Sequence, residues 1–302
     1  MEAAPVSIRR ARPLLGTFVE IAVAGQTFDA AEAAVEAAFS AVATVHRLMS
    51  FHEADSDVSR LNRGAASGPV RVHDWTCQVL EAARDLRRRS EGMFDISVAP
   101  ALQRLGLLPG ASPSQGETPG GVHDRIQLLP GNRVRFADPS VKIDLGGIAK
   151  GFAVDRAVEV LLGRGIAEGL VNAGGDLRVF GPRSHAVDIR DPRQPDRPLY
   201  RVALCNAALA SSAGRFDPVR SHSALFSGVI DPATAMPVRA ISGATVCGPG
   251  CMVADALTKV VMNAGEGAAA ILEHYGADAL FVSARGQVHI TADWKNEVHL
   301  AA

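Results

Sequence analysis

Lysine, aromatic residues and cysteine are all scarce in this chain. Of its 31 basic residues only four are lysines (Lys142, Lys150, Lys259 and Lys295), and aromatic residues make up 5% of the 302 residues. The formal net charge is −1, which argues against a nucleic-acid-binding or membrane-surface protein, because such proteins carry a basic patch or tail. No apolar run reaches the roughly 18 residues of a membrane helix. These absences favour a globular protein with an aliphatic core.

The cysteines and the N-terminal residues point to neither a zinc framework nor an export signal. Cys247 and Cys251 form a C-x-x-x-C pair, but Cys77 and Cys205 are remote and no histidine lies at zinc-finger spacing. Residues 1–12 contain arginines, yet no apolar signal core follows them. We therefore expect no structural zinc, and a cytoplasmic location, or a periplasmic one if a signal has been removed.

The apolar pattern predicts an α+β fold rather than regular βαβ units. Helices are expected over residues 29–48, 74–90, 148–162, 252–262 and 267–275. Strands are expected over residues 15–24, 126–129, 134–136, 169–171, 177–180, 186–190, 200–204, 242–246, 280–282 and 288–291. We predict a single domain over residues 10–292, with two subdomains as an alternative, and a C-terminal tail over 293–302. Residues 109–121, rich in glycine, proline and serine, predict a mobile loop.

A double glycine between a predicted strand and a predicted helix is the most informative local feature. The strand ends at Asp144, Gly146 and Gly147 form the turn, and Lys150 lies in the first turn of the helix. Glycines let backbone N–H groups approach an anion, and a helix N-terminus attracts negative charge. The spacing matches neither a P-loop nor a dinucleotide fingerprint. The turn therefore predicts a phosphate site, with a purely structural glycine turn as the alternative.

Four further segments combine glycine or apolar residues with carboxylates and hydroxyls. They are residues 94–97, 172–176, 230–234 and 254–259. In the last segment Thr258 and Lys259 follow Asp255 by three and four residues, so all three share one helix face. Each segment alone could be a turn cap or a paired core charge. Together they predict a site for phosphate and a divalent cation, because Mg²⁺ prefers oxygen ligands.

The order of these segments resembles that of the ApbE family of FAD:protein FMN transferases. The resemblance runs from about Arg12 to Thr291. It rests on Arg12-Pro-Leu-Leu-Gly-Thr17, Met49-Ser50, Asp57-Val-Ser-Arg-Leu-Asn62, Phe94-Asp-Ile-Ser97, Asp144-Leu-Gly-Gly-Ile-Ala-Lys-Gly151, Asn172-Ala-Gly-Gly-Asp176, Asp231-Pro232 and Ala254-Asp-Ala-Leu257.

The resemblance implies a nucleotide cleft between two interlocked halves and a transferase that uses FAD with Mg²⁺. Such an enzyme moves FMN onto a threonine or serine hydroxyl of an acceptor protein that carries a Ser/Thr-Gly-Ala-Thr motif, and releases AMP. The residues that the resemblance assigns to FAD are Met49, Asp95, Ile96, Ser97, Asp144, Gly146, Gly147, Lys150, Gly151, Asp176 and Ile230. The main-chain carbonyl of Ala149 and the carboxylate of Asp255 would hold the metal. Lys150 would also neutralise charge during catalysis.

The chain departs from the family pattern at two positions. Gly228 stands where the family usually has a histidine associated with proton transfer, so Asp231, His222 or Asp176 would have to act as the base. Lys259 stands where a metal-binding threonine or serine is expected. Either Thr258 takes that role, or the ammonium of Lys259 replaces the metal and weakens Mg²⁺ dependence.

These departures leave two other functions open. The chain could bind FAD without transferring it, or hydrolyse FAD to FMN and AMP. A further alternative is self-modification at Thr245, which lies in a Ser242-Gly-Ala-Thr245 sequence similar to the acceptor motif.

Overall fold

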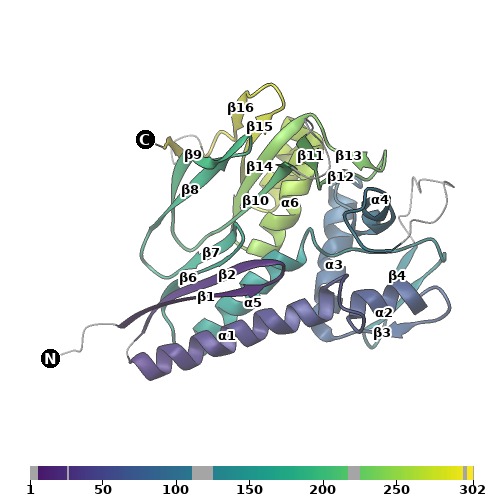
Figure 1. Cartoon of the computed structure of the whole chain (residues 1–302), viewed down its shortest axis with the longest axis horizontal. Coiled ribbons are helices and arrows are strands. Elements are labelled where there is room, and N and C mark those ends of the chain that lie inside the picture. The colour runs from purple at the N-terminus through teal and green to yellow at the C-terminus, as the bar shows by residue number, and fades with distance from the viewer. Residues whose placement is uncertain (1–5, 26, 111–124, 217–224, 295–297, 302) are drawn as a thin grey trace.

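A nine-stranded antiparallel sheet forms the centre of the fold (Figure 1). The computed structural model describes residues 6–25, 27–110, 125–216, 225–294 and 298–301. The strand order is β1 (Val6–Leu14), β2 (Thr17–Gly25), β6 (Glu168–Ala173), β7 (Asp176–Phe180), β10 (Ala208–Phe216), β14 (Ile241–Gly248), β15 (Asp278–Ser283) and β16 (Val288–Ile290), and β11 (Leu225–Ser227) pairs with β10.

Helices cover one face of this sheet. They are α1 (Phe28–Met49), α5 (Ala149–Gly163) and α6 (Cys251–Ala264). Successive residues of a strand point to opposite faces of the sheet. On β10, Ala208 and Ala210 accordingly belong to the core on the helix side, whereas Leu209 belongs to a second core on the other face. The small side chains of β10 let α6 pack close to the sheet.

A second, three-stranded sheet covers the opposite face. It consists of β8 (His185–Asp191), β9 (Gln194–Leu204) and β17 (Val298–Leu300). The core between the two sheets is built from alternate strand residues such as Val179, Val202 and Leu280, together with the buried side chain of Trp294. The segment predicted as a C-terminal tail therefore contains a strand, because β17 pairs with β9.

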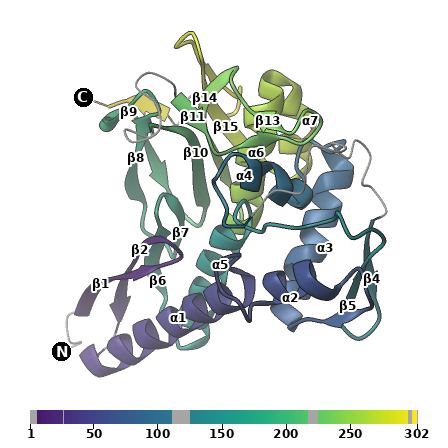
Figure 2. The same ribbon diagram turned by 45° about the vertical axis from the view of Figure 1, so that its right-hand side comes forward.

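The remaining elements form a smaller half beside α1 and α5 (Figure 2). They are α2 (Asp57–Gly64), α3 (Asp74–Arg89), α4 (Ala99–Arg104), and a sheet of β3 (Val70–Arg71), β5 (Arg133–Phe136) and β4 (Ile126–Leu129). Ile230 of β12 (Ile230–Asp231), which pairs with β13 (Met236–Pro237), packs on α4, whereas α7 (Ala269–His274) contacts β15 of the large sheet. Residues 137–148 lead from β5 of this half to α5 beneath the large sheet. The glycine turn thus lies where the two halves meet.

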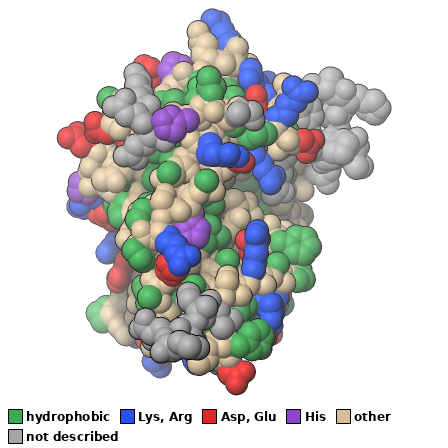
Figure 3. All heavy atoms as spheres, turned by 90° about the vertical axis from the view of Figure 1, so that its left-hand side faces the viewer, with side chains coloured by type: hydrophobic (Ala, Val, Ile, Leu, Met, Phe, Trp, Pro, Cys, Tyr) green, Lys and Arg blue, Asp and Glu red, His purple; other side chains and the backbone are tan. Residues whose placement is uncertain are grey.

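The predicted α+β class and the predicted helices are confirmed, with boundary shifts of a few residues. Strands β1 and β10 and the short strands β3, β11, β12, β13 and β17 were not predicted. Most of the predicted mobile loop lies outside the described residues. Among the described residues, no helix combines the length and the apolar character needed to cross a bilayer. Figure 3 shows positive and negative side chains interspersed on one face of the molecule.

Helices α5 and α6 cap each other's N-termini. Asp255 of α6 accepts a hydrogen bond from the Gly151 amide of α5 at 3.1 Å. In return, Asp155 of α5 accepts hydrogen bonds from the amides of Cys251 (3.0 Å) and Met252 (2.8 Å) in the first turn of α6. Neither helix has a side-chain cap at its own N-cap residue. This reciprocal capping satisfies amides that a helix leaves unpaired, and it fixes the crossing of the two helices.

The crossing requires glycine at position 151. A Cβ atom there would collide with the backbone of Cys251 and Met252 in α6. Backbone atoms cannot move aside as a flexible side chain can, so any larger residue would push the two helices apart.

We predict that Gly151→Ala lowers the free energy of unfolding by about 1–3 kcal/mol, because overpacking outweighs the helix propensity of alanine. Gly163→Ala, at the other end of the same helix, is the matched control, since a Cβ there meets nothing within 4 Å. Chemical denaturation of both variants measures the difference. Equal stabilities would show that the α5–α6 contact tolerates a side chain.

Candidate functional site

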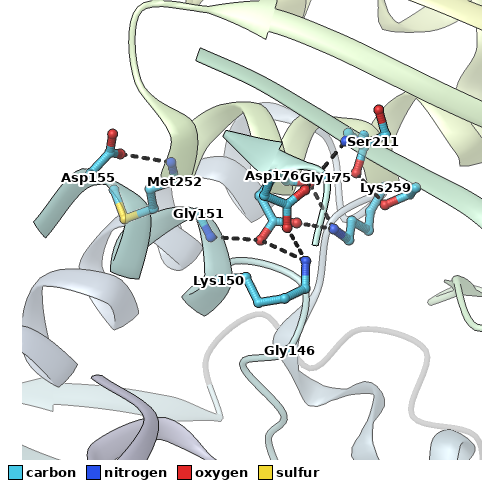
Figure 4. Close-up of polar contacts among 12 residues, drawn as sticks. Gly146, Lys150, Gly151, Asp155, Gly175, Asp176, Ser211, Met252 and Lys259 are labelled. Carbon is cyan, nitrogen blue, oxygen red and sulfur yellow. Dashed lines mark hydrogen bonds and ion pairs between the residues drawn. The ribbon is translucent and has the colours of Figure 1, made fainter. Parts of the chain in front are cut away.

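Two lysines and two aspartates from three elements meet at the start of α5 (Figure 4). Lys150 lies in the first turn of α5, Asp176 is the first residue of β7, and Asp255 and Lys259 lie one turn apart on α6. Asp176 follows Gly174 and Gly175, which both adopt positive φ angles of 67° and 103°. This turn between β6 and β7 places the Asp176 carboxylate on the helix side of the sheet. We call these four residues the lysine–aspartate cluster.

Each carboxylate of the cluster is paired with a lysine. The Lys150 ammonium forms an ion pair with Asp176 and lies 3.9 Å from Asp255. The Lys259 ammonium forms an ion pair with the Asp255 Oδ1 and donates a hydrogen bond to the main-chain oxygen of Asp255 at 2.9 Å. Asp176 and Asp255 are 1% and 0% exposed. Two carboxylates can be buried here because the two ammonium groups neutralise their negative charges.

Burial and charge act in opposite directions on the pKa values of the cluster. Burial alone would raise the pKa of Asp255, but the ammonium groups of Lys150 and Lys259 outweigh it and lower that pKa. Burial likewise would lower the pKa of Lys150, but Asp255 and Asp176 outweigh it and raise that pKa. For Asp176, burial and repulsion from Asp255 together raise the pKa despite the contact with Lys150. Asp255 and Lys150 are thus held charged, and Asp176 is the carboxyl group that accepts a proton more readily.

A pair of hydroxyl groups from α6 and β10 lies next to the Asp255 main chain. Thr258 donates a hydrogen bond to the main-chain oxygen of Asp255 at 2.6 Å, and its hydroxyl lies 2.7 Å from that of Ser212. Thr258 is fully buried. Its side chain is therefore part of the packing between α6 and β10 in this conformation.

The glycine turn is closed by its own aspartate. Asp144 accepts a hydrogen bond from the Gly146 amide at 3.1 Å, and its own amide donates to the carbonyl of Ile96 at 2.8 Å. Burial raises the pKa of Asp144. At the other end of the turn the Gly151 amide binds Asp255. The predicted phosphate cradle therefore already directs two of its amides at protein carboxylates.

Gly147 lies next to the aliphatic part of the Lys259 side chain. A Cβ at Gly147 would come within 3.2 Å of the Lys259 Cε. The aliphatic stem of Lys259 thus packs on the glycine turn and carries its ammonium to the start of α5.

A small hollow brings together two segments that the sequence assigned to the nucleotide. Asp95 and Ser97 line it together with Ile230, and Arg104 and Pro232 also contribute to its lining. Asp95 pairs with Arg87 at 2.7 Å and accepts hydrogen bonds from the amide and the hydroxyl of Ser97. The side chain of Ile96 is buried.

The other predicted site residues lie apart from the cluster or within the core. Met49 is 3% exposed and packs in the helix-side core, and Ala149 is buried in the first turn of α5. Asp231 accepts hydrogen bonds from the Ala233 amide and the Thr234 hydroxyl, both at 2.9 Å, which closes a turn after β12. Within the described part of the chain no hydrogen bond or ion pair joins Asp231 to the cluster. His222 lies outside the described residues.

Thr245 is buried within the large sheet. It is 4% exposed on β14, between β10 and β15, and its hydroxyl lies 2.9 Å from that of Ser211. Its hydroxyl is therefore inaccessible to a nucleotide donor in this fold, which argues against self-modification at this residue.

Asp155 and Ser212 also belong to the site and were not predicted from the sequence. Asp155 shares α5 with the charged residues Lys150, Arg156 and Glu159, so its charge alone gave no distinctive signal. Ser212 belongs to the undetected strand β10, whose alternation of small residues was weak. Both act through partners distant in the sequence, so no local pattern could have identified those partners.

Comparison with known proteins places the chain among flavin transferases. It is 29% identical over 235 residues to the FAD:protein FMN transferase of Vibrio cholerae, an alignment covering 74% of this chain and 70% of that protein. It is also 29% identical to the FAD:protein FMN transferase of Treponema pallidum, covering 94% of this chain and 86% of the relative. The crystal structure of the ApbE protein of Thermotoga maritima superimposes with a TM-score of 0.86 at 26% identity, covering 97% of this chain and 99% of the other.

The ApbE family model matches residues 15–281, which include the whole lysine–aspartate cluster. The chain therefore belongs to the ApbE family.

Proposed function

We propose that this protein is an FAD:protein FMN transferase, which moves FMN from FAD to a threonine or serine hydroxyl of an acceptor protein. The relatives in Vibrio cholerae and Treponema pallidum bear this name. The observation that carries the proposal is the lysine–aspartate cluster at the start of α5, between the two halves of the fold. Partly exposed ammonium groups at a helix N-terminus suit the pyrophosphate of FAD.

The proposed reaction is a phosphoryl transfer. The acceptor hydroxyl oxygen attacks the phosphorus of the FMN half of FAD, and a new P–O bond forms. The P–O bond to the AMP half breaks, AMP leaves with the bridging oxygen, and the hydroxyl proton passes to a base. Such transfers are catalysed mainly by positioning and by neutralisation of the charge on the phosphate oxygens.

Lys150 is the residue best placed to neutralise that charge. Its side chain is a third exposed, and the two carboxylates raise the pKa of its ammonium. The hollow between residues 95–97 and Ile230 would receive another part of the nucleotide. Of the bases considered from the sequence, Asp176 alone touches the cluster among the described residues. We therefore assign proton acceptance to Asp176 rather than to Asp231.

The divalent cation that the family resemblance implies fits poorly with the residues present. Its ligands would be the Ala149 carbonyl, Asp255 and Thr258. Both carboxylate oxygens of Asp255 are engaged, one by Lys259 and the other by the Gly151 amide. The Thr258 hydroxyl donates to the Asp255 backbone, and no group of three or more His, Cys, Asp or Glu side chains in the described residues could hold a metal. No step of the proposed reaction is assigned to Mg²⁺.

The transfer reaction predicts a covalent product. The protein is incubated with FAD and an acceptor fragment that contains Asp-x-x-Ser/Thr-Gly-Ala-Thr, with and without Mg²⁺, and the products are weighed. We expect the mass of the acceptor to increase by that of one FMN less one water, with one AMP released per transfer. An acceptor in which the terminal threonine is alanine is the control.

Two other results would identify the alternative functions. Free FMN and AMP with an unmodified acceptor would mean that water is the acceptor and that the protein is an FAD pyrophosphatase. FAD retained intact on the protein would mean that this family member binds FAD without cleaving it. Either result contradicts the proposed transfer.

The role of Lys150 predicts a large loss of activity in Lys150→Met. We expect AMP release to fall by about 10²–10³-fold, the usual effect of removing one preorganised group that stabilises a transition state. Lys142→Met is the matched control, because Lys142 takes part in none of the ion pairs found among the described residues.

Stability has to be measured in parallel, since Lys150→Met leaves Asp176 without its ammonium partner. Thermal unfolding separates loss of fold from loss of catalysis. Lys150→Arg keeps the charge and is expected to retain more activity than Lys150→Met. A folded Lys150→Met variant with turnover equal to that of Lys142→Met would remove Lys150 from the reaction.

A further inference from the structure

Lys259 binds Asp255, the carboxylate that the family resemblance assigns to the metal. Its ammonium contacts the Asp255 Oδ1 and, at 2.9 Å, the Asp255 main-chain oxygen. Its stem packs on Gly147 of the glycine turn. The Lys259 side chain is 18% exposed and is therefore only partly buried. A positive group is therefore fixed between the carboxylate of α6 and the turn that precedes α5.

Both carboxylate oxygens and the main-chain oxygen of Asp255 already bind other groups of the protein. Lys259 binds one carboxylate oxygen, and the Gly151 amide binds the other at 3.1 Å. The main-chain oxygen of Asp255 accepts hydrogen bonds from both Lys259 and Thr258. A metal ion at Asp255 would have to displace the Lys259 ammonium and break at least one of these hydrogen bonds.

The charges of the cluster also balance without a metal. Two ammonium groups face two carboxylates, and Lys150 and Lys259 both approach Asp255. A divalent cation inserted there would lie within contact distance of two positive groups, and like charges repel strongly in a weakly solvated site. The same repulsion would keep a hydrated Mg²⁺ from settling beside Lys259.

An ammonium can perform the electrostatic part of a cation's role. It has three N–H donors, and two of them are engaged by Asp255 in the structure. The third can donate to a nonbridging phosphate oxygen, while Lys150 approaches the same phosphate from α5. Lysine acts there as a point charge rather than as a ligand of fixed geometry.

We propose that the Lys259 ammonium takes the place of a divalent cation in this protein, so that FAD cleavage proceeds without Mg²⁺. This inference rests on the proposed transferase function for its catalytic part. Its metal-binding part stands on the geometry of Asp255 and Lys259 alone.

The test compares wild type, Lys259→Thr and Lys142→Met after removal of metals. AMP release from FAD is measured in EDTA and in excess Mg²⁺. Binding of Mn²⁺ alone is measured by electron paramagnetic resonance, and binding of Mg²⁺ alone by calorimetry, both without FAD.

For wild type and Lys142→Met, we expect the rate of AMP release in EDTA to lie within about twofold of the rate in Mg²⁺. We also expect neither protein to bind Mn²⁺ or Mg²⁺ at this site. For Lys259→Thr we expect a loss of about 10²-fold or more in EDTA, the scale of one missing electrostatic stabiliser. Mg²⁺ should restore most of that loss, and Mn²⁺ binding should appear, because Asp255 is released and a hydroxyl replaces the ammonium.

Lys259→Met keeps the stem packed on Gly147 and removes the charge, so it serves if Lys259→Thr is unstable. It should lose activity in EDTA to a similar extent. Wild-type activity that depends strictly on Mg²⁺, together with Mn²⁺ bound to wild type and abolished by Asp255→Asn, would overturn the inference.

Failure of the transferase function gives a different pattern. If wild type cleaves no FAD in either condition, the proposed function is wrong. The metal-binding measurements, which need no FAD, then test the inference about Lys259. Mn²⁺ bound by Lys259→Thr and not by wild type would then support the replacement of the cation by Lys259, and Mn²⁺ bound equally by both would contradict it.

Discussion

The reciprocal capping of α5 and α6 is the contact on which the site depends. Asp155 binds the first amides of α6, Asp255 binds the Gly151 amide of α5, and Gly151 lets the two helices approach. The same Asp255 carboxylate also holds Lys259 and faces Lys150. One buried carboxylate therefore links helix packing to the charges of the site. Its low pKa follows from the two ammonium groups that oppose the effect of burial.

This arrangement joins stability and function in a small volume. Buried ion pairs contribute little net stability when complete, but loss of one partner is costly because the other charge remains buried. The cluster is thus sensitive to every one of its four members. It also presents preformed positive charge to an anion without reorganisation, which is how electrostatic catalysis operates.

Much of the fold and part of the site follow from the sequence. The helices were predictable because their apolar residues recur with helical periodicity, and the glycine turn because Gly146 and Gly147 separate a strand from a helix. Strand β10 was missed because Ala208–Phe216 has few strong strand formers and its pairing with β14 is nonlocal. Asp231 was one of three candidate bases, and in the structure its carboxylate closes a turn, which is the ordinary behaviour of aspartate before proline. The two residues of each mutual cap are separated by 96 to 104 positions in the sequence, so no local pattern could reveal these caps.

The most direct test of the central claim is a crystal structure of the protein grown with FAD and Mn²⁺, with anomalous scattering measured for manganese. We predict that the FAD pyrophosphate contacts the ammonium groups of Lys150 and Lys259, and that Asp255 carries no manganese peak. A manganese ion bound to Asp255 with Lys259 displaced, or FAD bound away from the start of α5, would contradict it.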